Sequence, residues 1–183
     1  MIKLIDILED IENKILVPRR SKEERQKNFL IATQKKIQQY IKDGGKGALD
    51  LTNTPITSLP NNLQVGGGLY LENTPITSLP DNLQVGGGLY LNNTKISSLP
   101  NNLKVGDNLY LNNTPITSLP DNLKVGDGLY LKNTPISSLP DNLKVGDGLS
   151  LVNTPISKKY SKEEIKKMIE DKGGHVEDEI YML

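Results

Sequence analysis

Apolar side chains recur at fixed positions every 20 residues through the middle of the chain. In the stretch LYLENTPITSLPDNLQVGGG these positions are Leu69, Leu71, Ile76, Leu79, Leu83 and Val85. The alternation Leu-Tyr-Leu is typical of a β-strand, with both leucines on one side and the tyrosine on the other. Pro75 and Pro80 exclude a regular helix after that strand, and the glycines at 66–68 permit a tight corner. Each repeat is therefore predicted to be a short strand, an extended return and a glycine corner.

The pattern begins at Leu49, Leu69, Leu89, Leu109 and Leu129, and a shortened copy begins at Leu149. One repeat cannot bury its own leucines, whereas stacked repeats place each leucine beside its copy in a shared core. We therefore predict a solenoid of five full repeats and a partial one over residues 46–157. The threonine of each repeated Asn-Thr pair is expected to point inward and to bond the backbone of the neighbouring coil.

Both flanks carry helix signals. Residues 3–16 space their apolar side chains as one face of a helix. The run SKEE at 21–24 is a capping box that begins a second helix, which is expected to end at about Lys42. The same run at 161–164 begins a C-terminal helix, and residues 175–183 alternate loosely, as a terminal strand would. We assign residues 1–45 to a helical N-terminal cap or docking segment and residues 158–183 to a C-terminal cap.

On these motifs the chain resembles the leucine-rich repeat proteins. LYLENTPI matches the pattern L-x-L-x-x-N-x-L, with Thr74 in the asparagine position and Ile76 in the last apolar position. SLPDNL matches the return of the short repeats in secreted bacterial effectors, and similar VGGxLxLxxTxITSLP arrays occur in bacterial and phage proteins. The chain departs from the family where Gly66 occupies the first apolar position. The resemblance implies an α+β repeat fold, a curved solenoid whose concave face is a parallel β-sheet, with helical caps.

Composition narrows the function further. Opposite charges balance at 22 each, and the chain has no cysteine, which excludes disulfides, thiol catalysis and cysteine-ligated metals. The repeat region is mildly acidic, so a nucleic-acid partner is not expected. No stretch has the length of apolar residues that a membrane span needs, and the N-terminus lacks the apolar core of a signal peptide. We therefore expect a cytoplasmic protein, in a host or a bacterium.

The sequence assembles no catalytic group and calls for no cofactor. His175 is the single histidine and is expected in a solvated turn, and the glycine runs precede strands rather than the helix that a phosphate loop requires. Two columns of acids recur with the repeat: Asp107, Asp127 and Asp147, and Asp81, Asp121 and Asp141. They are either a solvated edge or, as an alternative, ligands for a hard cation such as calcium.

The outward strand positions carry the predicted binding face. It consists of Tyr70, Tyr90, Tyr110 and Tyr130, with Glu72, Asn92, Asn112 and Lys132 in the next outward position. The tyrosines either pack face to edge as a structural ladder or form an interface of the kind aromatic residues favour. Our main hypothesis is a non-enzymatic protein that binds a protein partner on this face. The resemblance implies a phage or bacterial protein, such as a host-interaction or counter-defence inhibitor. The alternatives are an assembly component that oligomerises through its N-terminal helices, and a calcium- or carbohydrate-binding module.

Overall fold

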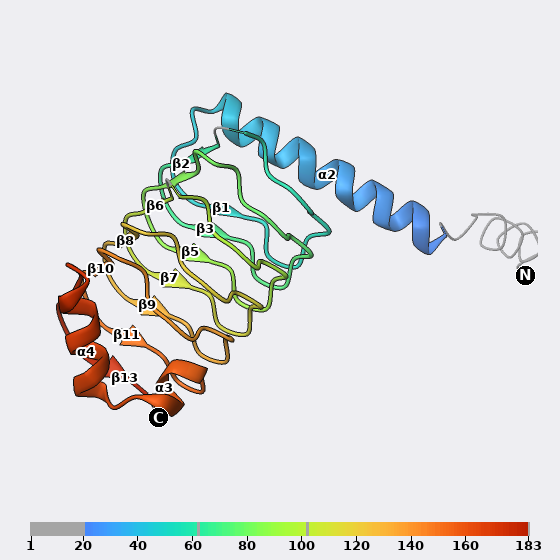
Figure 1. Ribbon diagram of the computed structural model, residues 1–183. Helices are drawn as coiled ribbons and strands as arrows, with labels where there is room; N and C mark the ends of the chain where they lie inside the picture. Colours follow the sequence, from blue (N-terminus) through green and yellow to red (C-terminus); the bar gives the residue numbers. More distant parts are fainter. Residues whose placement is uncertain (1–20, 62, 102, 183) are drawn as a thin grey trace, which may run out of the picture.

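The repeats stack into a β-solenoid with a helix at each end (Figure 1). The computed structural model describes residues 21–61, 63–101 and 103–182. Within these residues the strands form two parallel sheets. The seven-stranded sheet runs β1 (Leu49–Asp50), β3 (Leu69–Tyr70), β5 (Leu89–Tyr90), β7 (Leu109–Tyr110), β9 (Leu129–Tyr130), β11 (Leu149–Ser150) and β13 (Ile180–Tyr181). The six-stranded sheet runs β2 (Gln64–Val65), β4 (Gln84–Val85), β6 (Lys104–Val105), β8 (Lys124–Val125), β10 (Lys144–Val145) and β12 (His175–Val176).

Neighbouring repeats pair in exact phase, so that each residue lies beside its copy. Leu69 pairs with Leu89 and Tyr70 pairs with Tyr90, and the other pairs of full repeats follow the same register. The leucines of this sheet are fully buried, as are the isoleucines of the returns such as Ile116. Because every coil contributes the same side chains, the core is one continuous column rather than a central cluster.

The six-stranded sheet was not predicted. It arises from the pair that precedes each glycine corner, in which a polar residue faces solvent and a valine faces the core, as in Gln84 and Val85. The valine thus supplies the apolar side chain at the corner where the sequence pattern placed Gly66, and Gly66 itself lies at the surface.

The corner glycines are required for close approach between coils and not for an unusual φ angle. A Cβ atom on Gly126 would lie 1.7 Å from the carbonyl oxygen of Gly106, and one on Gly146 would lie 2.0 Å from that of Gly126. The positive φ angles of the described repeats belong to asparagines instead. Within the full repeats, stacking at one strand spacing therefore leaves no room for a side chain at this corner.

These asparagines form a ladder along the solenoid, which we call the asparagine ladder. Its members are Asn53, Asn73, Asn93, Asn113, Asn133 and Asn153, with φ between 55° and 59°. The Nδ2 of each donates to the Oδ1 of the copy one coil earlier, at 2.7–3.1 Å. Asparagine tolerates this backbone region better than most residues and satisfies its amide at the same time.

Substitution of Asn113 tests the asparagine ladder. Asn113→Ala removes hydrogen bonds to Asn93 and Asn133 and places alanine at a φ of 58°. We expect the free energy of unfolding to fall by about 2–3 kcal/mol in urea titrations. Asn113→Gly removes the same bonds but tolerates the φ angle, so it should lose clearly less. Equal losses in the two variants would show that the backbone angle contributes nothing.

The predicted threonine column is inward, but its hydrogen bonds differ from the expectation. Thr74, Thr94, Thr114 and Thr134 are buried as predicted. The hydroxyl of Thr114 donates to the carbonyl of Leu111 at 2.7 Å, three residues earlier in the same coil. The prediction of a bond to the neighbouring coil was wrong because the turn at the asparagine brings the carbonyl of its own strand within reach.

The N-terminal helix α2 (Lys22–Lys42) confirms the second predicted helix and its capping box. It lies across the end of the stack near β1 and β2, and its first turns project beyond the coils (Figure 1). It buries only Thr33 and Ile37. Phe29, Ile31 and Ile41 remain exposed. The predicted helix over residues 3–16 lies outside the described residues.

The C-terminal cap continues both sheets. The partial repeat leaves the extended path at α3 (Pro155–Lys159), which Thr154 caps, and α4 (Lys162–Asp171) follows its predicted capping box. Ile165 and Ile169 of α4 are buried against the last coil. His175 then begins β12 and does not lie in the expected solvated turn. It pairs with Lys144, so that β12 adds one more strand to the six-stranded sheet.

Candidate binding face

The structure brings the four predicted tyrosines together as one stacked row, which we call the tyrosine row. Consecutive rings from Tyr70 to Tyr130 have centroids 4.4, 4.8 and 4.5 Å apart, with planes inclined by 10°, 13° and 6°. The predicted face-to-edge packing was therefore wrong. A constant register at one strand spacing gives every ring the same rotamer, and rings this close stack in parallel.

Three rings of the row, those of Tyr70, Tyr90 and Tyr130, lie on edge over the glycine that precedes their strand, and Asn108 stands in that place before Tyr110. A Cβ atom on Gly68, Gly88 or Gly128 would lie 3.0, 2.9 or 2.8 Å from the Cε2 atom of the following tyrosine. On Gly128 it would lie 2.8 Å from the hydroxyl of Tyr130. The hydroxyls therefore reach back toward the glycine corner, and the rings are half-buried. Because neighbours cover the ring faces, the row presents ring edges and hydroxyls to solvent.

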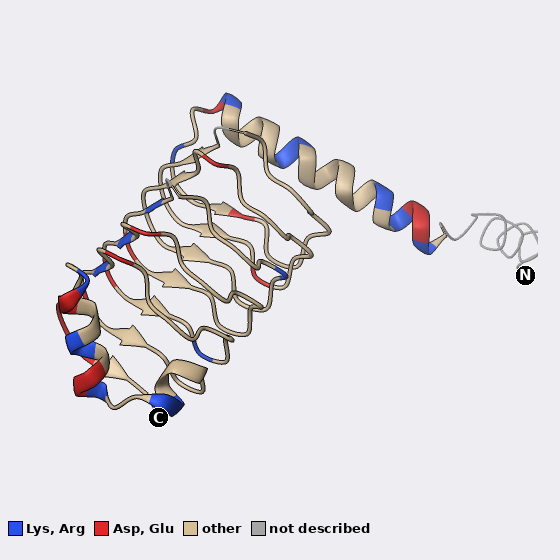
Figure 2. Cartoon of the chain, in the orientation of Figure 1, with Lys and Arg blue, Asp and Glu red and all other residues tan. Residues whose placement is uncertain are grey.

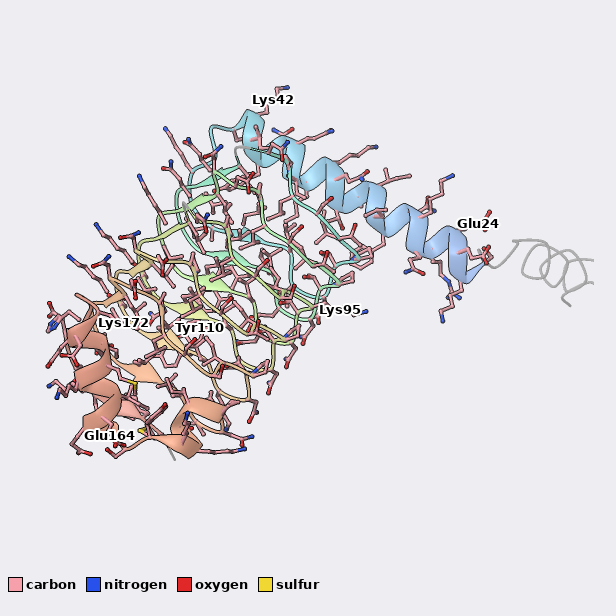
Figure 3. The ribbon with its side chains drawn as sticks, in the orientation of Figure 1. Glu24, Lys42, Lys95, Tyr110, Glu164 and Lys172 are labelled. Carbon is pink, nitrogen blue, oxygen red and sulfur yellow. The ribbon has the colours of Figure 1, made fainter. Side chains whose placement is uncertain are left out.

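The second predicted position forms a hydrogen-bonded row beside the tyrosines. Asn92 Nδ2 donates to Glu72 Oε1 at 2.9 Å, and the backbone N–H of Asn112 donates to Asn92 Oδ1 at 3.0 Å. The N–H of Lys132 in turn donates to Asn112 Oδ1 at 2.9 Å. The structure thus places all eight predicted residues on one face, with Tyr110 within the stack between α2 and α4 (Figure 3). The asparagine side chains are held in place by these bonds, whereas Lys132 is exposed.

The pKa values of the two central tyrosines, Tyr90 and Tyr110, are raised mainly by burial and in smaller part by neighbouring tyrosines and carboxylates. Burial is the main cause that raises the pKa of Tyr90, and Tyr70, Asp107 and Glu72 add to it. Burial also raises the pKa of Tyr110, with contributions from Tyr130, Tyr90 and Asp127. Carboxylates therefore lie near the hydroxyls on the corner side of the row.

These shifts predict a pH dependence. The pKa of Tyr90 and Tyr110 is raised in the folded state, so the unfolded chain releases these protons first as pH rises. Stability should therefore be complete below the ordinary tyrosine pKa, near 10, and fall above it. Thermal unfolding of the protein and of a Tyr90→Phe/Tyr110→Phe variant between neutral and strongly alkaline pH checks this. The variant should lose stability less steeply; identical slopes would contradict the assignment.

One residue of the face was missed in the sequence. Tyr181 lies on β13, where it pairs with Ser150 and so continues the column of the tyrosine row. The signal is the run HVEDEIYM at 175–182, which aligns with KVGDGLSL at 144–151 in register and hydrophobic pattern. The helices α3 and α4 lie between the two runs, so the last coil does not follow the fixed spacing of the other repeats.

The acidic columns do not converge on a site for a metal ion. Among the described residues no group of three or more histidine, cysteine or acidic side chains is placed to hold one. The hollows of the surface lie elsewhere, for example between α2 and the first coil, where Leu30, Ile37, Ile56 and Pro60 line one. No described helix has the length and apolar character that crossing a membrane requires.

A comparison with protein-family models finds none that matches the chain, and a comparison with curated proteins finds no match.

Proposed function

We propose that the protein is a non-enzymatic recognition module that binds a protein partner across the tyrosine row. The observation that carries the proposal is an uninterrupted row of four half-buried tyrosines on a regular sheet. The scaffold does not demand them, because Asp50 and Ser150 hold the same position in the end repeats. Aromatic side chains of this kind supply contact area at low entropic cost in protein interfaces.

The geometry favours a protein over the other ligands considered. Carbohydrates and single-stranded nucleic acids stack on the faces of aromatic rings, and these faces are covered within the row. Ring edges and hydroxyls on an extended sheet instead suit contact with the broad surface of another protein. The resemblance to leucine-rich repeat arrays of bacteria and phages supports the narrower proposal that the partner is a host protein and that the module inhibits it.

The proposal is tested by replacing Tyr70, Tyr90, Tyr110 and Tyr130 with serine, the residue found at Ser150. Capture from a lysate of the native host, with quantitative mass spectrometry, should show a protein that binds the wild type and is lost with the variant. A Thr57→Ala/Thr77→Ala/Thr117→Ala variant changes exposed positions of the return and should retain it. Circular dichroism confirms that each variant is folded. A folded serine variant that keeps every partner would refute the proposal.

A second candidate is assembly through α2. Phe29, Ile31 and Ile41 are exposed by 48%, 40% and 46% on a helix that buries only two residues against the coils. Light scattering on the protein and on a Phe29→Ser/Ile31→Ser/Ile41→Ser variant separates the two functions. Assembly predicts an oligomer that the variant dissociates, whereas a wild type that stays monomeric at high concentration rules assembly out.

A further inference from the structure

The tyrosine row does not end at Tyr130 but is resumed by the C-terminal cap. Tyr181 stands beside Ser150 in the sheet, and its ring occupies the space over Gly148, 2.8 Å from where a Cβ atom would lie. In the full repeats that space is filled by the tyrosine of the same strand. Ser150 is small and almost covered, while Tyr181 is 46% exposed. The cap therefore supplies an aromatic side chain where the last repeat lacks one.

A row of carboxylates follows the same end of the face. The position directly after the corner glycine is Gly67 and Gly87 in the first coils. It is acidic in the later ones, at Asp107, Asp127, Asp147 and Asp178, which we call the corner acids. Their register is fixed by the backbone, since the N–H of Asp127 donates to the carbonyl of Asp107 at 3.2 Å and that of Asp178 to Asp147 at 3.4 Å. All four side chains are exposed.

The corner acids belong to the tyrosine side of the corner. Burial comes first among the causes that raise the pKa of Tyr90, Tyr110 and Tyr181; Asp107 adds to it at Tyr90, Asp127 at Tyr110, and Asp178, Glu179 and Asp147 at Tyr181. The lysines of the corner, Lys104, Lys124 and Lys144, stand on the outer side of the six-stranded sheet instead. Figure 2 shows the charges gathered along this edge, by β6, β8 and β10, while the strands of the seven-stranded sheet are largely uncharged. Corner acids thus occur only from the coil of Asp107 onward; in the first coils the carboxylates of the face are Asp50 and Glu72.

We infer that the C-terminal half of this face, from Tyr110 to Tyr181, takes a lysine- or arginine-rich segment of the partner protein. The inference rests on the proposed function and names the chemistry of its partner. The covered ring faces exclude stacking of the cation within the row. The alkyl stem of a basic side chain instead lies across the ring edges, and its charged head reaches the corner acids and the tyrosine hydroxyls. The first coils, with Gly67 and Gly87 at the equivalent position, offer no corner acid.

The test is a selection of random peptides displayed against the wild-type protein, counted by sequencing. Peptides that bind the wild type but not the four-serine variant are expected to be enriched in lysine and arginine. Synthetic copies should lose at least about tenfold in affinity for an Asp127→Asn/Asp147→Asn/Asp178→Asn variant. They should also lose several-fold for Tyr181→Ser, and bind more weakly as salt is raised. The matched control, Asp81→Asn/Asp121→Asn/Glu163→Gln, removes the same charge elsewhere and should bind as the wild type does.

The outcomes separate the inference from the function beneath it. Tyrosine-dependent peptides without an excess of basic residues, or with unchanged affinity for the triple-asparagine variant, overturn the inference and leave the binding face standing. Equal losses of affinity in the triple-asparagine variant and its control also overturn it, because the losses would then follow from the overall charge of the protein and not from the corner acids. The absence of any tyrosine-dependent peptide overturns both.

Discussion

Gly126→Ala is expected to destabilise the protein by about 3 kcal/mol or more, although it adds a single methyl group. The new Cβ atom would lie 1.7 Å from the carbonyl oxygen of Gly106 and 2.6 Å from its carbonyl carbon. Both are backbone atoms of the preceding coil, so relief requires the two coils to separate. Separation would stretch the backbone hydrogen bonds on both sides of the corner. Urea titration followed by circular dichroism measures the loss.

Gly128→Ala is the matched control, two residues away in the same coil. Its Cβ atom would meet the ring of Tyr130, the far end of a side chain, and not the backbone of the preceding coil. The third repeat already carries a side chain at this position, Asn108, whose Oδ1 accepts from the N–H of Gly128. We expect Gly128→Ala to cost less than about 1 kcal/mol. Similar losses for the two alanines would show that close approach of the coils does not explain the corner glycines.

Leu111→Ala is expected to lower the free energy of unfolding by about 3–4 kcal/mol. Leu111 is 0% exposed in the middle of the stack, with the buried Leu91 and Leu131 in the equivalent positions of the adjacent coils. The cavity is closed by coils that are held in register by the sheet and the asparagine ladder, so little relaxation can fill it. Chemical denaturation gives the value.

Thr117→Ala provides the comparison for Leu111→Ala, because Thr117 is exposed in the same repeat. It should change stability by no more than about 0.5 kcal/mol. If Leu111→Ala were as mild as this control, the core would not be the single packed column that the burial of its leucines indicates.

The period of the sequence predicts the solenoid because stacking leaves one arrangement for a repeated apolar pattern. Leu109, Leu111 and Ile116 are buried as expected, and both capping boxes begin helices where predicted. The six-stranded sheet escaped prediction because each of its strands, such as Lys124 and Val125, stands directly before the glycines that indicate a corner. Its existence depends on pairing between coils, which no single repeat displays.

The candidate face was predictable in its members but not in its geometry. Alternation alone places Tyr70 to Tyr130 outward. Whether their rings meet in parallel or edge to face depends on the rise between coils and on the residue under each ring, which is a glycine at Gly68, Gly88 and Gly128. Tyr181 was missed because α3 and α4 interrupt the fixed spacing before the last coil. The hydrogen bonds of Asn92 and Asn112 likewise become visible only when two coils are placed side by side.

The in-phase pairing of the coils also sets how the molecule can change its size. The full repeats bond to their copies 20 residues earlier or later, as Asn113 does with Asn93 and Asn133. Recombination that duplicates one whole repeat would therefore lengthen the face by about 5 Å and add a tyrosine, without requiring a new core. An insertion of another length keeps this pairing only if the extra residues leave the coil, as α3 and α4 do before β12. The length of the solenoid is thus adjustable in steps of one coil.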